Sequence, residues 1–368
     1  MPPARKTKSR SATARTKAAA LPSQSLESPF PPINLPIKPP YPPMEAKSSD
    51  TIPEDGPYLY EPKWDGFRCL AFRSGDKILL QSKAGQPLGR YFPELVAALA
   101  QLKARKFVLD GEIVIVIFVG DRLSFDDLLM RIHPAESRIR KLSASTPATL
   151  MCFDLLADEH GKSLVQLPLS ERRRKLEEFF ASNASAKMIR LSPASMESSQ
   201  AKKWMREQST MGLDGIIAKR FDEPYHSGDR NAMIKVKRIR TADCVVGGFR
   251  YAEKGTGIGS LLLGLYNDEG QLDHVGFTSS FNAEQREDLK KTVEPLIGPP
   301  GFTVRAPGAP SRWSTKRSSE WQPLKPKLVC EVSYDHFSGG RFRHGTRFMR
   351  WRPEKRPDQC TFEQLQGR

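Results

Sequence analysis

The chain has 368 residues, 38% of them hydrophobic, which is enough for a substantial core and, at typical domain sizes, about two domains. Lysine and arginine number 58 against 42 acidic residues; the formal charge of +16 disfavours an enzyme of cationic or neutral metabolites and suits a polyanion such as nucleic acid. Five scattered cysteines without a CxxC spacing predict neither a disulfide framework nor a zinc site, and they fit a reducing cytosol.

The N-terminal region is basic and then rich in proline. Residues 1–28 have no acid before Glu27 and cannot bury enough apolar surface to become ordered, so we expect a disordered basic tail that helps to hold DNA phosphates. The same composition is also typical of an organelle transit peptide. The stretch PFPPINLPIKPPYPP (29–43) predicts an extended segment without helix or sheet, and we expect folded structure to start near Tyr58.

From Tyr58 onwards, strand-like and helical patterns alternate. The strand-like runs include KILLQS (77–82) and FVLDGEIVIVIFV (107–119), and the helical stretches include FPELVAALAQLKAR (92–105), ERRRKLEEFF (171–180) and SQAKKWMREQ (199–208). The longest apolar run, 113–120, is too short to span a bilayer, so we expect no membrane segment. The alternation predicts a mixed α/β domain over residues 29–240.

After about Arg240 the pattern changes to short strands separated by glycine turns. The runs are CVVGGFR, SLLLGLYN, DHVGFTS, LVCEVSY and TRFMRWR. Many short strands at close spacing are typical of a small β-barrel, which we predict over residues 241–368.

A candidate nucleophile lies in EPKWDGFR, residues 61–68. A lysine becomes a nucleophile only when its ammonium loses a proton, and neighbouring cations or desolvation favour that loss. Arg68 supplies one such cation and can also hold a phosphate oxygen. A KxDG tetrapeptide alone is more typical of a turn, so the interpretation of Lys63 depends on the rest of the chain.

The segment resembles the first motif of the nucleotidyltransferases that form a lysine–AMP or lysine–GMP phosphoramidate, a superfamily of DNA ligases, RNA ligases and mRNA capping enzymes. Further motifs follow in the family's order: SKAG (82–85), LDGEIVI (109–115), MCFDLL (151–156), LDGIIAKR (213–220) and MIKVK (233–237). Two positions depart from the family pattern. Lys83 stands where arginine is usual, and Asp214 stands where most members have glutamate.

The resemblance implies roles for individual residues. Lys63 would be the catalytic nucleophile, Glu61 would read the adenine amino group and Phe153 would stack on the base. Glu112 and Asp214 would hold a metal ion, and Glu112 would also hold the ribose hydroxyls. The remaining nucleotide contacts would be Arg68, Ser82, Lys83, Arg230, Lys235 and Lys237. Taken singly, Phe153 also fits a core residue, Glu112 a surface acid, and Lys235 and Lys237 a solvated strand face.

The C-terminal stretch from Arg341 resembles the sixth motif of the family, which lies on an OB-fold and acts on the pyrophosphate leaving group. The matching cations are Arg350, Arg352 and Lys355. The six histidines show no metal-ligand spacing, so we expect them in core or surface roles. The sequences of these motifs most resemble those of bacterial ligase C and of the ligase domain of ligase D. This resemblance implies an α+β chain, with a mixed α/β nucleotidyltransferase (adenylation) domain of the ATP-grasp-like ligase type followed by a β-barrel OB-fold domain.

The implied activity is that of an ATP-dependent DNA ligase, which seals 5′-phosphate/3′-hydroxyl breaks in duplex DNA through a lysine–AMP intermediate during DNA repair or recombination. The expected cofactors are ATP and Mg²⁺, with Mn²⁺ as the alternative metal. The expected partners are nicked or broken duplex DNA and a DNA end-binding protein such as Ku, for a monomer in the bacterial cytoplasm at the nucleoid. An RNA ligase, a capping-type nucleotidyltransferase and a non-catalytic DNA end-binding protein remain as alternatives.

Overall fold

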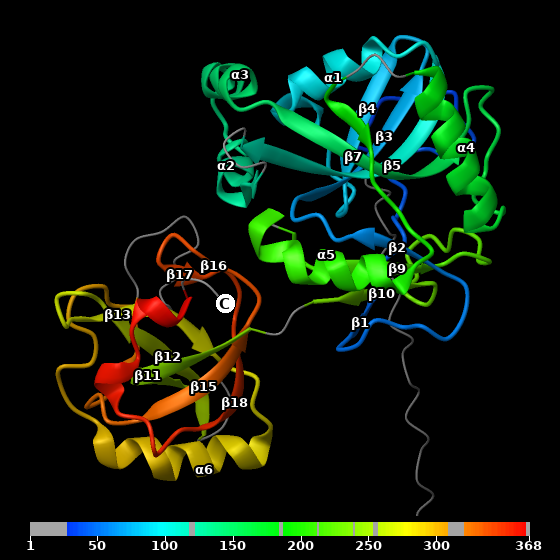
Figure 1. The fold of residues 1–368 in the computed structure, drawn as a ribbon. Coiled ribbons are helices and arrows are strands. Elements are labelled where there is room, and N and C mark those ends of the chain that lie inside the picture. Colours follow the sequence, from blue (N-terminus) through cyan, green and yellow to red (C-terminus); the bar gives the residue numbers. More distant parts are fainter. Residues whose placement is uncertain are drawn as a thin grey trace, which may run out of the picture.

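The structure is a computed structural model that describes residues 28–117, 122–183, 187–211, 213–237, 240–252, 257–307 and 320–365. The predicted basic tail lies outside these residues, apart from Ser28. The described chain forms an upper body from residues before 238 and a lower body from residues after 239, joined near the start of the strand at Arg240 (Figure 1). We call them the N-terminal body and the C-terminal body.

A large sheet forms the core of the N-terminal body. Its strand order is β4-β3-β5-β7-β8, with β6 paired to β5: β3 (Phe67–Ser74), β4 (Lys77–Ser82), β5 (Lys106–Ile117), β6 (Arg122–Leu123), β7 (Ala148–Ala157) and β8 (Ile189–Leu191). Every residue of β7 is buried, as expected for a central strand covered on both faces. The helices around this sheet are α1 (Pro93–Ala100), α2 (Phe125–Met130), α3 (Glu136–Ser145) and α4 (Leu169–Ser182).

A smaller sheet lies beside the first and completes the N-terminal body. It has the order β1-β10-β9-β2, with β1 (Lys47–Ser49), β2 (Tyr58–Pro62), β9 (Ile216–Arg220) and β10 (Met233–Val236). Helix α5 (Ser198–Met211) packs on β2 and β9. The motif segments therefore meet: β2 leads into EPKWDGFR, β5 carries LDGEIVI, and β9 and β10 carry the last two motifs of this body. The predicted mixed α/β character is confirmed.

The proline-rich stretch is extended, as expected, but it belongs to the folded body. Phe30, Ile33, Leu35 and Ile37 are all buried, and the last three pack into a core cluster with residues of β3, β5 and β7. Our expectation that folded structure starts near Tyr58 is therefore wrong. Proline prevents helix and sheet hydrogen bonding, but it does not prevent the apolar side chains between the prolines from packing.

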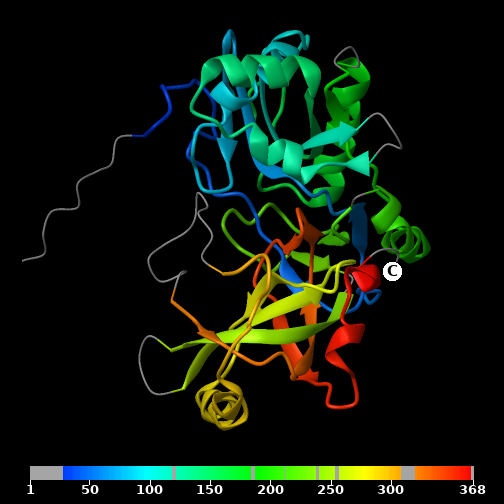
Figure 2. The same ribbon diagram turned by 90° about the vertical axis from the view of Figure 1, so that its left-hand side faces the viewer.

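The C-terminal body is built on a six-stranded sheet with the order β13-β12-β11-β15-β18 and β14 paired to β11. Its strands are β11 (Arg240–Tyr251), β12 (Ile258–Tyr266), β13 (Leu272–Thr278), β14 (Gln322–Pro323), β15 (Val329–Tyr334) and β18 (Arg347–Trp351). A hairpin of β16 (Phe337–Ser338) and β17 (Arg341–Phe342) projects towards the N-terminal body (Figure 2). The strands predicted from the short apolar runs are all present, and they enclose a second hydrophobic core.

Helix α6 (Ala283–Val293) was not predicted, although its start carries a clear signal. Asn282 accepts a hydrogen bond from the Gln285 backbone, and the Gln285 side chain accepts one from the Asn282 backbone, which is a capping box. Short 3-10 helices complete the chain: Gly89–Tyr91, Glu294–Leu296, Pro357–Gln359 and Phe362–Leu365. No helix among the described residues is long and apolar enough to cross a membrane. The five cysteines are buried and unbridged.

His274 on β13 should make the stability of the protein depend on pH. Burial, with the charges of Arg341, Arg250 and Arg305, lowers the pKa of His274 from 6.5 to about 3. Between these values the unfolded chain binds a proton that the folded chain does not. The contribution of the neutral His274 to the free energy of unfolding is therefore fully present above pH 6.5 and is lost as the pH falls towards 3. From pH 7.5 to pH 5, urea unfolding should show the wild type losing about 2 kcal/mol more than His274→Leu.

The exposed His160 provides the matched control. His160→Gln should follow the wild-type pH dependence. If wild type and His274→Leu lose stability in parallel, His274 does not carry this effect.

Candidate active site

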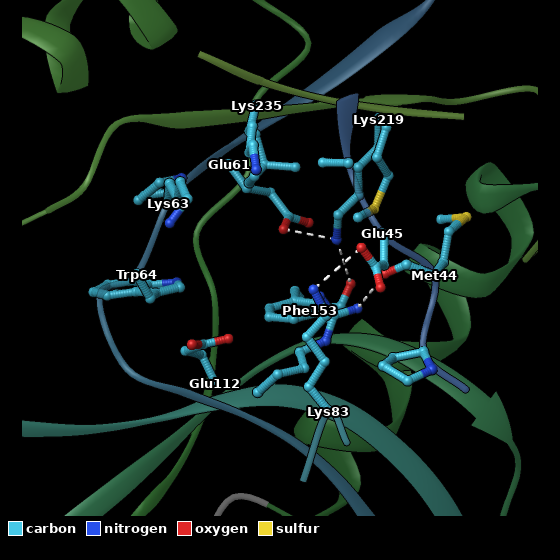
Figure 3. A pocket seen from close by; sticks show the side chains of 16 residues that line it. Met44, Glu45, Glu61, Lys63, Trp64, Lys83, Glu112, Phe153, Lys219 and Lys235 are labelled. Carbon is cyan, nitrogen blue, oxygen red and sulfur yellow. Dashed lines mark hydrogen bonds and ion pairs between the residues drawn. The ribbon is translucent and has the colours of Figure 1, made fainter. Parts of the chain in front are cut away.

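A cavity of about 230 Å³ lies between the two sheets of the N-terminal body, and half of the predicted site residues line it. Figure 3 shows the lining side chains converging from both sheets, with Lys63 and Lys235 on one side and Glu112 and Phe153 on the other. The predicted residues that line it are Glu61, Lys63, Arg68, Lys83, Glu112, Phe153 and Lys235. The lining residues that we did not predict are Pro43, Met44, Glu45, Ala46, Pro62, Trp64, Ile217, Lys219 and Met233.

Lys63 is held where the loop after β2 meets the loop before β9. Its backbone N–H donates to the Gly215 carbonyl, and its carbonyl accepts from the Asp214 N–H, each at 2.8 Å. A Cβ at Gly66 would lie 2.1 Å from the Ile113 carbonyl oxygen, and one at Gly215, where φ is +131°, would lie 2.1 Å from the Val236 carbonyl oxygen. Only glycine permits these approaches. Gly66 therefore lets the Lys63 loop lie against β5, and Gly215 lets the Asp214 loop lie against β10.

Asp214, on the loop before β9, is the centre of a cluster of charged side chains around Lys63. Its Oδ2 accepts from the ammonium groups of Lys63 and, at 2.8 Å, Lys237, and its Oδ1 lies 2.9 Å from Nε2 of His336. Burial alone would raise the pKa of Asp214, but the hydrogen bond with His336 and the charges of Lys63 and Lys237 together lower it well below its usual range. Asp214 is therefore an ionised carboxylate that binds the candidate nucleophile directly.

Glu112 carries a carboxylate directed at the cavity. Burial raises its pKa to about 7, against the opposing charges of Arg68 and Lys63. Within the described part of the chain, no hydrogen bond or ion pair to the Glu112 carboxylate is found. A partly buried carboxylate that lacks a protein partner fits a hard cation such as Mg²⁺. The donor set is therefore compatible with the predicted metal role of Glu112.

The buried carboxylate of Asp110 fixes the guanidinium of Arg68. Its Nε and Nη2 donate to the two carboxylate oxygens at 2.6 and 2.7 Å, and the Tyr225 hydroxyl donates to Asp110 at 2.6 Å. The guanidinium lies 4.7 Å from the centre of the Phe153 ring. Asp110 thus holds a cation at the cavity wall beside a ring on which a base can stack.

Glu61 lies at the inner end of the cavity and is almost fully buried. Its Oε2 accepts from Lys219 at 2.8 Å, and Arg173 is 3.6 Å from Oε1. Burial raises the pKa of Glu61, and the charges of Lys219 and Arg173 oppose that rise. Lys219 also lies 4.3 Å from the centre of the Phe153 ring. A polar end beside an aromatic ring is an arrangement that can orient a purine.

Cations at the rim of the cavity are paired with Glu45. Its carboxylate binds Lys83 at 3.1 Å and Arg230 at 2.8 Å. Burial lowers the pKa of Lys235, as do the charges of Lys237 and Lys63. Arg230 and Lys237 are not among the lining residues. Arg230 contacts Glu45 at the rim, and Lys237 contacts Asp214. Ser82 is not a lining residue either; its hydroxyl accepts a hydrogen bond from Gln86, which shapes the turn after β4.

The predicted cations of the C-terminal body are engaged within that body. Arg350 binds Glu331 at 2.7 Å, while Arg352 and Lys355 bind Asp243 at 2.8 and 3.3 Å. They do not line the cavity in this arrangement. Their predicted role on the leaving group stays a prediction.

Other residues of the C-terminal body reach the site instead. Arg343 donates to both oxygens of Asp65, at 3.0 and 2.8 Å, and His336 contacts Asp214. Donor atoms of Asp65, Asp214 and His336 lie within 4.8 Å of one another. Asp65 belongs to the KxDG motif, but we gave it no role. We expected all histidines in core or surface roles, and His336 instead contacts Asp214 beside the cavity. No local pattern could have indicated it, since its partner is 122 residues away.

A lysine on a loop between two sheets, facing a cavity with an aromatic wall, cations and carboxylates, defines a nucleotidyltransferase that can form a covalent bond to a nucleotide. Residues 43–237 match the family model of the ATP dependent DNA ligase domain, and residues 254–355 match that of the ATP dependent DNA ligase C terminal region. The chain belongs to the ATP-dependent DNA ligase family. It is a DNA ligase that uses ATP, as the motifs predicted.

Known proteins resemble the chain over almost its whole length. It is 45% identical to DNA ligase C1 of Mycolicibacterium smegmatis, over 90% of this chain and 96% of that protein. It is 42% identical to DNA ligase C of Mycobacterium tuberculosis, over 91% and 96%. A solved structure of a Lig E DNA ligase is similar in fold, with a TM-score of 0.55 at 16% identity, over 84% of this chain and 99% of that one.

Proposed function

We propose that the enzyme seals 5′-phosphate/3′-hydroxyl breaks in duplex DNA through an AMP group carried on Lys63. The observation that supports this most strongly is the position of the Lys63 amine, which faces the cavity while Asp214 binds it. In the first step the Lys63 ammonium gives up a proton to solvent, and the uncharged amine attacks the α-phosphorus of ATP. The N–P bond forms, the nitrogen loses a second proton to solvent, the bond from phosphorus to the bridging oxygen breaks, and pyrophosphate leaves with the electron pair.

The roles of the other residues follow from their places around the cavity. Phe153 offers a face for the adenine, and Glu61 with Lys219 can read its polar edge. Arg68 and Lys235 at the wall, with Lys237 beside Lys63, would neutralise the charge that develops on the α-phosphate. Lys83, Arg230 and Ser82 would serve the phosphates at the rim after Glu45 releases the two cations.

Glu112 and Asp214 would hold a Mg²⁺ ion, with Mn²⁺ as the alternative. When bound, the ion supplies positive charge to the phosphate oxygens. Glu112 is suited to it because its carboxylate faces the cavity and is only partly buried. Asp214 would have to exchange part of its Oδ2 contact with Lys63 and Lys237 for the metal. Loss of the Lys63 proton and the Lys63 charge on adenylation favours that exchange.

In the later steps AMP passes to the 5′-phosphate of the break, and the neighbouring 3′-hydroxyl displaces it to form the phosphodiester bond. We propose domain boundaries at 29–240 and 241–368, with an OB-fold in the second domain that covers the duplex. Arg350, Arg352 and Lys355 would have to leave their present acidic partners to reach the pyrophosphate in the first step. The two bodies would then reorient for the later steps.

The cellular setting is part of the same proposal. The formal charge of +16 supports binding to the DNA backbone, so affinity should fall with salt. Unbridged, buried cysteines are compatible with a reducing cytoplasm, where the enzyme would act at the nucleoid as a monomer. A DNA end-binding protein such as Ku is the proposed partner for double-strand breaks.

The test is to offer the protein labelled ATP or GTP, then a nicked duplex of DNA or of RNA. We expect label on the protein from ATP, with GTP at least about 10-fold slower because Glu61 and Lys219 form a fixed polar end. We also expect sealing of the DNA nick. Label from GTP or sealing of RNA alone would support a capping-type enzyme or an RNA ligase, and no label from either nucleotide would support a non-catalytic end-binding protein.

A further inference from the structure

His336 is the one side chain of the described C-terminal body that contacts the carboxylate holding Lys63. It lies between β15 and β16, and only 17% of its side chain is exposed. Its Nε2 is 2.9 Å from Asp214 Oδ1 and 3.8 Å from Asp65 Oδ2, so the ring sits between the acids of two motif loops. The imidazole therefore contacts the acids of the site directly.

The direction of the hydrogen bond follows from the state of Asp214. Its Oδ2 is bound by the ammonium groups of Lys63 and Lys237, so the carboxylate acts as an acceptor. Nε2 of His336 therefore carries the hydrogen and donates it to Oδ1. The other oxygen, Oδ2, stays with Lys63 and Lys237. With one oxygen fixed by the C-terminal body, the Asp214 side chain cannot rotate without breaking a contact.

We propose that His336 is a positioning residue for formation of the Lys63–AMP bond. Asp214 binds Lys63 and Lys237 through one oxygen, and rotation of the carboxylate would move that oxygen away from Lys63, so the side chain needs a fixed orientation. The C-terminal body provides it through His336, and the enzyme is ready for the first step only while that contact is made. The inference rests on the proposed role of Lys63 as the nucleophile.

Two other roles compete with this one. His336 could be a simple contact between the bodies, like Ser338, whose hydroxyl lies 3.3 Å from Asp126. It could also be a metal ligand with Asp65 and Asp214. The geometry argues against the second: Nε2, the ring nitrogen nearest to both acids, carries the hydrogen that it donates to Asp214 Oδ1, so it offers no lone pair to a metal ion.

The experiment separates the steps. Full-length His336→Ala and His336→Gln are compared with wild type in single-turnover adenylation by ATP and Mg²⁺, and in sealing of a nick that already carries AMP on its 5′-phosphate. The alanine variant should adenylate about 10- to 100-fold more slowly, as for a misplaced nucleophile, with sealing changed by less than about 2-fold. Glutamine can offer an amide N–H near the place of Nε2 and should recover most of the rate.

The control is Ser338→Ala, which removes a contact between the same two bodies without touching Asp214 and should leave both steps within about 2-fold of wild type. Wild-type adenylation by His336→Ala, or an equal loss in both steps, would overturn the proposal. So would a higher Mg²⁺ requirement in His336→Gln, which would identify a metal ligand. Should the alanine variant fail to fold, His336→Asn is compared with His336→Gln, and equal rates for the two would overturn it. Absence of adenylation in wild type would instead refute the proposed function.

Discussion

Lys63→Arg should abolish adenylation, with a loss of at least about 10³-fold against wild type when label from ATP is followed on the protein. Arginine keeps a cation beside Asp214, so the charge balance of the cluster is preserved. Its guanidinium stays protonated, however, and offers no lone pair to phosphorus. The loss therefore reports the missing amine and not a missing charge.

The same variant should still seal a nick that already carries AMP, because the displacement by the 3′-hydroxyl does not use the Lys63 amine. Lys77→Arg, at an exposed position on β4, is the matched control and should be adenylated like wild type. Label on Lys63→Arg at a rate near that of wild type would mean that another residue is the nucleophile.

Asp110→Ala should destabilise the enzyme by about 3–5 kcal/mol, which is the usual cost of leaving one member of a buried ion pair without its partner. Asp110 is fully buried, it binds Arg68 through both oxygens, and it accepts from Tyr225. Its loss leaves a guanidinium without a counter-ion between the two sheets. The free energy of unfolding from a urea titration gives the size of the effect.

A second arginine–aspartate pair of the same geometry but in solvent serves as the control. Asp222 binds Arg220 through both oxygens, at 2.9 and 2.7 Å, and both side chains are partly exposed. Asp222→Ala should cost less than about 1 kcal/mol, since water screens the pair. Equal losses for the two variants would show that burial of Asp110 does not set its contribution.

The sequence was most informative where chemistry and local pattern coincide. Strands such as 77–82 and 106–117 follow from their apolar runs, and Lys63, Glu112 and Phe153 follow from their motifs, since each motif is a short segment with its own glycine or acid. The cavity does bring these three side chains together. Whether each performs its predicted role stays a prediction that the variants above address.

What could not be predicted depends on contacts between distant segments. Arg343 meets Asp65 across 278 residues, and His336 meets Asp214 across 122. Neither pair leaves a periodic or spaced signal, because only the docking of the two bodies brings them together. The packing of the proline-rich stretch could not be predicted for a different reason. Its composition predicts an extended backbone but does not reveal which surface Ile33, Leu35 and Ile37 cover.

The most direct measurement is the location of the adenylate. Wild-type protein incubated with ATP and Mg²⁺, digested and sequenced by tandem mass spectrometry, should carry AMP on the peptide that contains EPKWDGFR, with the added mass on Lys63. An adenylate on a different side chain, or none on a protein shown to be folded, would contradict the account of this site.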